Sequence, residues 1–269
     1  MSALPNATPS RPVALITGAS SGIGAVYADR LAARGYDLIL VARRGDRLAA
    51  LAEDLKAHGA SARIQIADLT TEAGLSAVES LLADDPSIAL LVNNAGLARI
   101  GGFGAMSAGD IAAQLSLNIV APTRLTHAVL PGFLARGAGA IINIASAVAL
   151  HTYPGTTVYS GTKAYMLAFS RGIAEEVAGS GIRVQAVLPA AVGTEIYDLS
   201  GFDIASVPSE FVMTTQNLVD AALSGFDAGE SVTLPSVEDA TLWDSFEAAR
   251  LPLFAASQSG TPASRYHNG

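Results

Sequence analysis

The sequence predicts an α/β fold: a doubly wound parallel sheet with helices on both faces, built as one domain in three α/β/α layers. Short β-rich runs alternate with longer helical segments, which is typical of parallel strands joined by crossover helices. The chain shows no tandem repeat and no linker that would divide it. With 50% hydrophobic and 15% charged residues, it can bury a large core or apolar surfaces between subunits.

Seven segments are expected to be strands, because each is a short run of apolar and β-branched residues. In chain order they are Val13–Thr17, Asp37–Ala42, Ala62–Ala67, Ile88–Val92, Ala140–Ile144, Arg183–Leu188 and Ser231–Leu234. Longer segments between them are expected to be helices. They include Ile23–Ala33, Arg47–His58, Glu72–Ala83, Ala108–Ala135 and Val158–Ala178, and Val237–Arg250 also has a helical pattern.

Both ends of the chain are expected to lie outside this domain, which would span residues 13–250. Residues 1–12 are rich in Pro, Ser and Asn and predict a flexible tail, while residues 251–269 are rich in Ser, Gly and Pro and predict a loose one. The N-terminus has no basic segment followed by an apolar one, as a secretory signal would have. A cytoplasmic protein is therefore expected.

Charge and composition exclude several function classes. The formal net charge is −8 and the basic residues are dispersed, so neither nucleic acid nor a membrane surface is expected as a partner. The chain has no cysteine, which removes disulfides, thiolate metal sites and thiol catalysis, and no metal site is expected. The charge-free stretch 137–162 is interrupted by Asn143, His151 and Pro154, and it predicts a strand, a loop and a helix start rather than a membrane span.

The first expected strand runs straight into a glycine-rich turn, Thr17-Gly18-Ala19-Ser20-Ser21-Gly22-Ile23-Gly24, that opens a helix. Glycines let the backbone approach a pyrophosphate, and the helix N-terminus offers free N–H groups to an anion. The spacing departs from G-x-G-x-x-G and could mark only a turn, but its place in the chain favours a dinucleotide site. The expected cofactor-binding residues are Gly18, Ser20, Ser21, Gly22, Ile23 and Gly24.

The end of the second strand bears on which dinucleotide is bound. An NAD site usually has a carboxylate about 20 residues after the glycines, whereas this chain has Arg43 and Arg44 there. A guanidinium can fork onto the oxygens of a 2′-phosphate, which predicts a preference for NADP(H). Two surface arginines in a loop are the alternative, and NAD(H) stays open as a cofactor.

Tyr159 and Lys163 form the pair in this chain that best predicts chemistry. At i, i+4 they share one helix face, so the ammonium can favour the ionised phenol and allow it to shuttle a proton. Ser146 lies just upstream, at the end of an apolar run. A solvated helix face with an extended lysine is the alternative for the pair taken alone.

Together these segments resemble the short-chain dehydrogenase/reductase family in its single-domain branch, from Val13 to about Pro235. The matching segments are Thr17–Gly24, Asp68-Leu69, Asn93-Asn94-Ala95-Gly96, Asn118, Ser146, Tyr159-x-x-x-Lys163 and Pro189–Thr194. The resemblance implies a Rossmann-like fold and further cofactor contacts from Asp68, Leu69, Asn94, Ala95, Gly96, Pro189, Val192 and Thr194, with Asp68 at the adenine and Val192 and Thr194 at the nicotinamide carboxamide. The alternatives are a helix N-cap for Asp68 and a strand-end cap for Asn93.

The resemblance also implies the catalytic roles. Ser146 would polarise the substrate carbonyl, Tyr159 would act as general acid or base, and Lys163 would lower the pKa of Tyr159 and bind the ribose. Asn118 would support a water-linked proton relay. A strand-end hydroxyl and a buried helix-to-strand contact are the alternatives for Ser146 and Asn118. One departure is Ala190, because the family usually has glycine after this proline, and alanine would be strained at a positive φ.

The family places the substrate against two loops, which are mostly apolar and aromatic here. The expected pocket residues are Val148, His151, Tyr153, Ile196 and Tyr197. With no Arg or Lys cluster to hold an anion, this lining predicts an uncharged ketone, aldehyde or alcohol as substrate. The segment 195–215 has the Gly, Ser and Pro content of a mobile lid, or of a fixed loop whose aromatic residues fill a small core.

Small residues on the two longest expected helices permit close contact between subunits, and the family commonly pairs such helices. A homodimer or homotetramer is therefore expected. Two other functions remain open on the same fold: a non-catalytic NADP-binding regulator, and an epimerase or dehydratase that retains its cofactor. The four expected catalytic residues argue against the regulator, and the chain has no room for the extra C-terminal domain usual in the epimerases.

Overall fold

The structure is a computed structural model that describes residues 11–198 and 200–266. The chain divides into two units, Met1–Pro235 and Ser236–Gly269. Apart from Arg11 and Pro12, the predicted tail of residues 1–12 lies outside the described residues, as do residues 267–269 of the other predicted tail. The predicted domain boundaries at residues 12 and 250 stay predictions.

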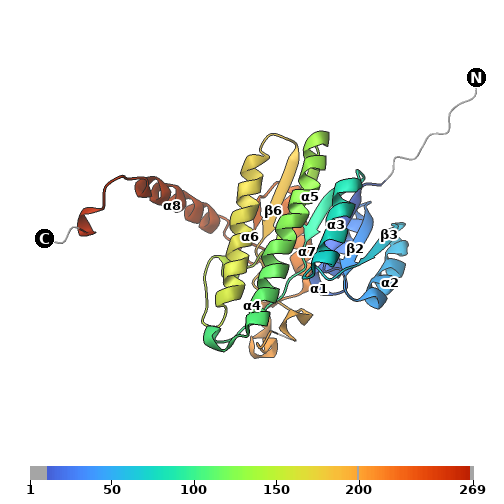
Figure 1. The fold of residues 1–269 in the computed structure, drawn as a ribbon, viewed down its shortest axis with the longest axis horizontal. Coiled ribbons are helices and arrows are strands. Elements are labelled where there is room, and N and C mark those ends of the chain that lie inside the picture. The colour runs from blue at the N-terminus through green and yellow to red at the C-terminus, as the bar shows by residue number, and fades with distance from the viewer. Residues whose placement is uncertain (1–10, 199, 267–269) are drawn as a thin grey trace, which may run out of the picture. The chain divides into compact units, whose positions relative to one another are not determined.

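A seven-stranded sheet forms the centre of the first unit (Figure 1), in the order β3-β2-β1-β4-β5-β6-β9, and every neighbouring pair is parallel. The strands are β1 (Val13–Thr17), β2 (Asp37–Ala42), β3 (Ala62–Ile66), β4 (Ile88–Asn93), β5 (Gly139–Ile144), β6 (Ile182–Val187) and β9 (Val232–Thr233). All the predicted strands are present, with ends that differ by no more than one residue. The predicted doubly wound parallel sheet is confirmed.

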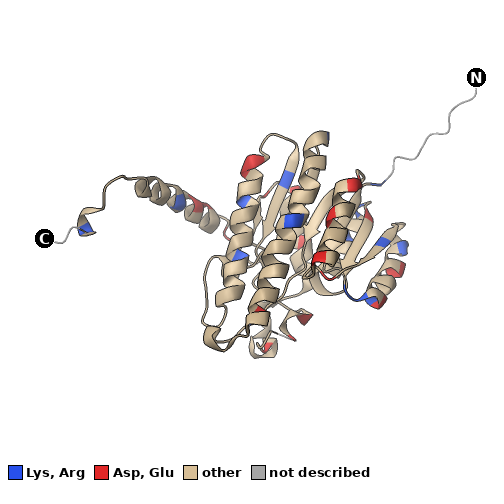
Figure 2. Ribbon diagram, in the orientation of Figure 1, with Lys and Arg blue, Asp and Glu red and all other residues tan. Residues whose placement is uncertain are grey.

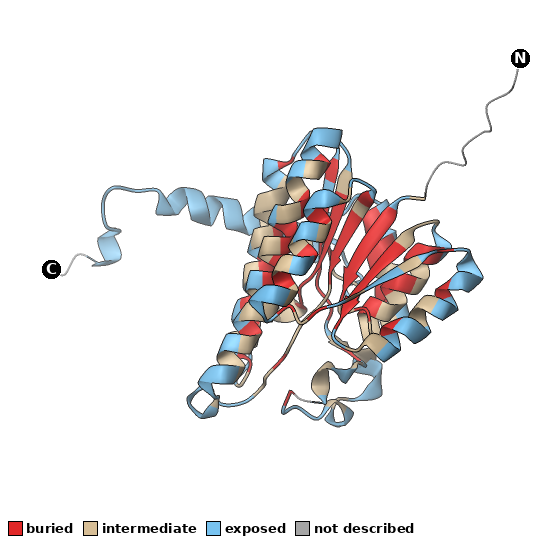
Figure 3. Cartoon of the chain, turned by 45° about the vertical axis from the view of Figure 1, so that its right-hand side comes forward, coloured by how far each residue is buried: buried red, intermediate tan, exposed pale blue. Residues whose placement is uncertain are grey.

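Each face of the sheet has its own hydrophobic core, because successive side chains of a strand point to opposite faces. Ile16, Leu40 and Val92 belong to one core, and their neighbours Leu15 and Ile39 to the other. The first core is covered by α1 (Gly22–Ala33), α2 (Gly45–Asp54) and α7 (Thr215–Asp227), and the second by α3 (Glu72–Asp84), α5 (Ala121–Arg136) and α6 (Thr157–Glu176). Figure 3 shows the strands as a buried layer between helices.

The predicted helix Ala108–Ala135 is interrupted in the structure. It consists of α4 (Ala108–Leu115), a π-helical turn (Ser116–Val120) and α5. Single π-helical turns inside helices are frequently found at functional sites. The turn contains Asn118, which is one of the expected catalytic residues, and the sequence pattern did not predict it.

The order of the strands reverses at β1, which pairs with β2 on one side and β4 on the other. In open parallel sheets, ligands bind beyond the carboxyl ends of the strands at such a switch point. The chain after β6 borders the same end: β7 (Ala191–Val192) and β8 (Val212–Met213) form a small parallel pair, and the described residues between them include short 3₁₀ turns. The sequence predicts a mobile lid or a fixed loop over residues 195–215, and among its described residues the structure has short 3₁₀ turns and the strand β8 there.

The second unit contains α8 (Thr241–Ser257), which overlaps the predicted helix Val237–Arg250 and continues into the part predicted as a loose tail. Acidic and basic residues are interspersed along the described part of the chain (Figure 2). Within residues 11–198 and 200–266, no helix is both long and apolar enough to cross a membrane.

Candidate active site

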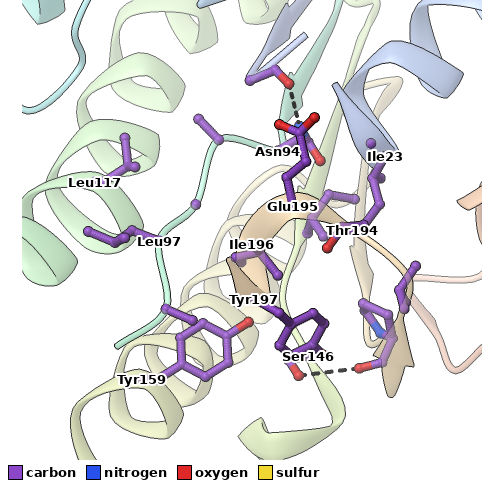
Figure 4. Close-up of a pocket in the computed structure, with 18 of the residues that line it drawn as sticks. Ile23, Asn94, Leu97, Leu117, Ser146, Tyr159, Thr194, Glu195, Ile196 and Tyr197 are labelled. Carbon is purple, nitrogen blue, oxygen red and sulfur yellow. Dashed lines mark hydrogen bonds between the residues drawn. The ribbon is translucent and has the colours of Figure 1, made fainter. Parts of the chain in front are cut away.

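A cavity of about 1020 Å³ lies at the carboxyl ends of the strands. It is lined by the glycine-rich turn, by the ends of β2, β4 and β5, by the start of α6 and by residues 189–198. Nearly all the expected cofactor, catalytic and substrate-pocket residues border this one cavity; Gly24 and Asn118 do not. Figure 4 shows Tyr159, Ser146, Ile196 and Tyr197 toward one end of this cavity, and Thr194 and Glu195 toward Asn94 and Ile23.

The glycine-rich turn has no space for side chains at two positions. A Cβ atom on Gly24 would lie 2.4 Å from the carbonyl oxygen of Gly18 and 2.5 Å from Nδ2 of Asn94. Gly18 has φ +68°, and its Cβ atom would lie 2.8 Å from the same Nδ2. The bare backbone therefore stays open to the cavity at the start of α1, as a pyrophosphate requires.

Asn94 holds this turn in place. Its Nδ2 donates to the carbonyl oxygens of Thr17 (2.8 Å) and Gly18 (3.3 Å), while Thr17 Oγ1 accepts the backbone N–H groups of Asn94 and Ala95. Ala95 and Gly96 line the cavity beyond it. Asn94 thus helps to form the cofactor end of the cavity by fixing the backbone at the ends of β1 and β4.

The two expected phosphate-binding arginines lie in different surroundings. Arg43 has a side chain 73% exposed and its nearest carboxylate, Asp68, is 3.9 Å away. Arg44 instead donates to Ser20 Oγ, to Ser21 Oγ (2.7 Å) and to Glu195 (2.7 Å). Arg44 is therefore the arginine that faces the glycine-rich turn.

Glu195 was absent from the expected site residues. It accepts a second hydrogen bond from Arg47 (2.6 Å), and these bonds from Arg44 and Arg47 lower the pKa of its carboxyl group to about 2. Arg47 was likewise missed. No local pattern marks either residue, because the contact joins the start of α2 to the segment after β6, far along the chain.

Two alternatives from the sequence are corrected by the structure. Thr71, not Asp68, is the N-cap of α3, since its hydroxyl accepts the N–H of Gly74; Asp68 accepts the N–H and hydroxyl of Thr70 and lines the cavity. Asn93 does not cap the end of β4. Its side-chain amide donates to Thr126 and to Asn143 in a buried polar network between β4, β5 and α5.

Ser146 and Tyr159 meet at the substrate end of the cavity. Ser146 Oγ donates to the carbonyl oxygen of Pro189 (3.2 Å) and accepts the N–H of Val148 (3.4 Å). Tyr159 keeps some surface open to the cavity, but the protein around it desolvates its phenol and raises its pKa, which a hydrogen bond with Ser146 opposes. The ionised phenol therefore needs a positive charge beside it.

Lys163 lies one helical turn from Tyr159 and is buried. Its Nζ atom donates to the carbonyl oxygen of Ile144 (2.7 Å) and lies 5.6 Å from the ring centroid of Tyr159. Burial lowers the pKa of Lys163 to about 8, so the side chain is still mostly an ammonium at neutral pH. Lys163 therefore supplies the cation that the i, i+4 spacing predicted near the Tyr159 phenol.

Asn118 occupies the π-helical turn behind Lys163. Its Oδ1 accepts the N–H of Leu97 (2.9 Å), and its Nδ2 donates to Leu97 O and Thr162 Oγ1. The side chain thus fixes the loop after β4 against α6. Its role in a proton relay stays a prediction.

The substrate half of the cavity is apolar and aromatic. His151 contacts Tyr153 edge to face, with ring centroids 5.0 Å apart, and Tyr197 packs on Phe202 with centroids 5.9 Å apart. The sequence did not point to several further lining residues, which come from the loop after β4, the π-helical turn and residues 202–207: Leu97, Ile100, Leu117, Phe202 and Val207.

The departure at Ala190 causes no backbone strain. Throughout residues 11–198 and 200–266, positive φ angles occur at glycines alone. Ala190 therefore has an ordinary backbone conformation, and Pro189, Val192 and Thr194 border the cavity around it.

Comparisons with known proteins agree with this geometry. A short-chain dehydrogenase family model matches residues 12–200. A short-chain dehydrogenase from Sphingobium yanoikuyae, solved in complex with NADPH, is 48% identical with a TM-score of 0.91, over 95% of this chain and 100% of that one. A bulky-bulky ketone specific alcohol dehydrogenase from Comamonas testosteroni is 42% identical with a TM-score of 0.88, over 96% of this chain and 100% of that one.

Among curated relatives, a very-long-chain 3-oxoacyl-CoA reductase from Anas platyrhynchos is 34% identical over 200 residues, which is 70% of this chain and 62% of that protein. The chain thus spans less than two thirds of that relative's length. The family model covers strands β1 to β6, the glycine-rich turn and the segment with Ser146, Tyr159 and Lys163. By its fold, its site and its match to the family model, the chain belongs to the short-chain dehydrogenase/reductase family.

Proposed function

We propose that the protein is an NADP(H)-dependent oxidoreductase that interconverts an apolar ketone or aldehyde and the corresponding alcohol. The observation that carries the proposal is a single cavity. It joins Ser146, Tyr159 and Lys163 to the glycine-rich turn and to Arg44. Proton transfer and dinucleotide binding can therefore take place side by side.

The residues present fit a bound NADP(H). The backbone at Gly18 leaves space for a pyrophosphate, and Arg44, together with Ser20 and Ser21, offers donors for a 2′-phosphate. Asp68 and Leu69 would contact the adenine, and Val192 and Thr194 the nicotinamide carboxamide. The NADPH complex of the Sphingobium enzyme supports this cofactor. When bound, the nicotinamide supplies or accepts the hydride.

The protein's own residues would handle the proton. In the reducing direction Tyr159 donates it to the carbonyl oxygen, while the Ser146 hydroxyl stabilises the negative charge that develops there. Burial, followed by the nearby Tyr197, raises the pKa of the Tyr159 phenol and so makes its ionised form costly; the Lys163 ammonium offsets part of that cost when the proton leaves. Asn118 would hold the loop and helix that border a water-linked relay to Lys163.

The lining of the cavity supports an uncharged, apolar substrate. Val148, Tyr153, Ile196 and Tyr197 line its substrate half, while the basic residues among the described lining are Lys163 beside Tyr159 and the pair Arg43 and Arg44 that follows β2. The similarity to an alcohol dehydrogenase specific for bulky-bulky ketones favours ketones with two large apolar substituents. His151 would shape the pocket rather than react.

The expected homodimer or homotetramer, and the cytoplasmic location, also stay proposals. Small residues on α5 and α6 support the assembly, because they allow helices of two subunits to approach closely. Light scattering on the eluted protein during size-exclusion chromatography would measure the assembly directly.

The test is the oxidation of NADPH and NADH, followed at 340 nm, with a panel of bulky apolar ketones and aryl aldehydes. Turnover with NADPH that falls by about 10²-fold or more in Tyr159→Phe would support the reductase and the role of the phenol. NADPH binding without turnover on any substrate would favour the regulator. Stereochemical exchange without net NADPH consumption would favour the epimerase.

A further inference from the structure

We infer that Glu195 is a specificity-determining residue, because its carboxylate occupies the arginine donors that the 2′-phosphate of NADP(H) requires and must leave them when that phosphate binds. Its departure then releases the start of the segment after Thr194, whose described residues Glu195, Ile196 and Tyr197 border the cavity. The inference rests on the proposed use of NADP(H). It adds that the Glu195 carboxylate competes with the 2′-phosphate of that cofactor for the same arginines.

The hydrogen bonds of Arg44 show why the two anions compete. A guanidinium has five N–H donors. On Arg44, Nε and Nη2 bond to Ser20 and Ser21, and Nη1 bonds to Glu195 at 2.7 Å. The serine contacts fix the guanidinium beside the glycine-rich turn, so Nη1 is the group left to bind an added phosphate. That group already donates one of its two N–H bonds to Glu195.

Arg47 completes the clamp. It donates to the other carboxylate oxygen of Glu195, so each oxygen of this one carboxylate has its own arginine. The Glu195 side chain is 44% exposed, and displacing it therefore requires no unpacking of the core. A 2′-phosphate that displaces this carboxylate can accept hydrogen bonds from both Arg44 and Arg47.

The charges around Arg44 and Arg47 favour replacement of the Glu195 carboxylate by the 2′-phosphate over binding of both anions at once. A phosphate monoester carries a charge of about −1.5 to −2 at neutral pH, more than the single charge of a carboxylate. The two arginines lower the pKa of Glu195 to about 2, so it cannot relieve the repulsion by taking up a proton near neutral pH. The nearby Arg43 is partly balanced by Asp68 at 3.9 Å.

Glu195 also connects the two ends of the cavity. It begins the 3₁₀ turn Glu195–Tyr197, directly after Thr194, whose side chain lies against Gly22. Ile196 and Tyr197 follow and line the substrate half, facing Tyr159 (Figure 4). Loss of its two arginine contacts therefore removes the tie between the start of this segment and α2, next to residues that line the substrate half.

The first test is equilibrium binding by calorimetry of NADP⁺, NAD⁺ and adenosine 2′,5′-bisphosphate to the wild type and to Glu195→Gln. We expect the variant to bind NADP⁺ and the bisphosphate about fivefold to tenfold more tightly, and NAD⁺ within about twofold of wild type. Glu210→Gln is the matched control, since it makes the same charge change in an exposed part of the same segment. It should leave all three dissociation constants unchanged.

The outcomes separate this inference from the proposed function. If wild type prefers NADP⁺ but Glu195→Gln binds it equally or more weakly, Glu195 positions the arginines rather than competing for them, and the inference fails alone. If wild type binds NADP⁺ no more tightly than NAD⁺, the proposed cofactor fails and the inference fails with it. If Glu210→Gln tightens NADP⁺ binding equally, the effect comes from the change in net charge, and the inference is also overturned.

Hydrogen–deuterium exchange tests the release of the segment. Adenosine 2′,5′-bisphosphate has no nicotinamide half to contact residues 195–213, so any change there must come through the phosphate end. We expect it to increase exchange of this segment in wild type, whereas 5′-AMP should not. In Glu195→Gln the exchange should already be high without ligand. No increase in wild type would contradict the release.

Discussion

The Nζ atom of Lys163 lies 5.6 Å from the ring centroid of Tyr159, on the same face of α6, and is bonded to a strand-end carbonyl rather than to solvent. The protein keeps a charged group inside the fold, next to a phenol whose pKa is raised by the same burial. Such an arrangement reduces stability in order to place a cation where the proposed chemistry needs it.

Lys163→Met should make the protein more stable at pH 7 and remove its activity. Burial lowers the pKa of Lys163 to about 8 from its usual 10.5, and holding the ammonium in the fold below pH 8 costs about 3 kcal/mol, at about 1.4 kcal/mol per pKa unit. Loss of the hydrogen bond to the carbonyl oxygen of Ile144 destabilises the variant by about 1 kcal/mol. A net gain of about 2 kcal/mol is expected in urea unfolding.

The pH dependence of that gain identifies its cause. Between about pH 8 and 10.5 the unfolded chain holds a proton that the folded chain has released, so wild type becomes more stable as pH rises and the advantage of the variant disappears. Lys56→Met, at an exposed lysine paired with Glu53, should show no such trend. A gain that is constant from pH 7 to 10.5 would rule out the buried charge as its origin.

Ser146→Ala should lower kcat/KM by about 10²-fold and leave the free energy of unfolding within about 1 kcal/mol of wild type. The hydroxyl bonds weakly to Pro189 and Val148, so its removal costs little structure. Steady-state kinetics and urea unfolding measure the two effects. Ser170→Ala, at a buried serine bonded to Asn143, should instead affect stability and not turnover; the reverse pattern would contradict the assignment.

Arg44→Gln should weaken NADP⁺ binding by about tenfold or more and change NAD⁺ binding by less than about threefold, because it removes the guanidinium that faces Ser20 and Ser21. Arg43→Gln is the matched control, with its side chain 73% exposed. Titration by fluorescence or calorimetry distinguishes them. An equal loss in Arg43→Gln would mean that both arginines bind the 2′-phosphate, and would contradict the choice of Arg44 over Arg43.

Gly24→Ala should abolish cofactor binding or prevent folding, because its Cβ atom would lie 2.4 Å from a backbone oxygen. Gly172→Ala is expected to do the opposite. Apart from the neighbouring backbone of its own helix, no atom lies within 4 Å of a Cβ atom there, and alanine stabilises a helix interior by about 0.5–1 kcal/mol relative to glycine. Thermal unfolding of both variants, with and without NADP⁺, measures this. A Gly24→Ala variant that binds NADP⁺ normally would show that the turn can shift.

Much of the fold was predictable because parallel strands covered on both faces must be apolar runs, and the runs of this chain start and stop within one residue of the observed strands. The pairing of Tyr159 with Lys163 was predictable for a similar reason, since helical periodicity alone places them on one face. The break at Asn118 was not. The side chain of Asn118 bonds to Leu97 and Thr162, which lie on other segments of the chain.

The sequence by itself determined the elements that follow local rules: strand and helix positions, the glycine-rich turn and the spacing of the tyrosine and lysine. The tertiary structure decided which of the two arginines faces that turn, that Glu195 holds it, and that Asn94 braces the glycines. Local patterns arise from steric and hydrophobic preferences within a few residues. Contacts such as Arg44 with Glu195 depend on where the sheet brings distant strand ends together, and only the folded chain sets that distance.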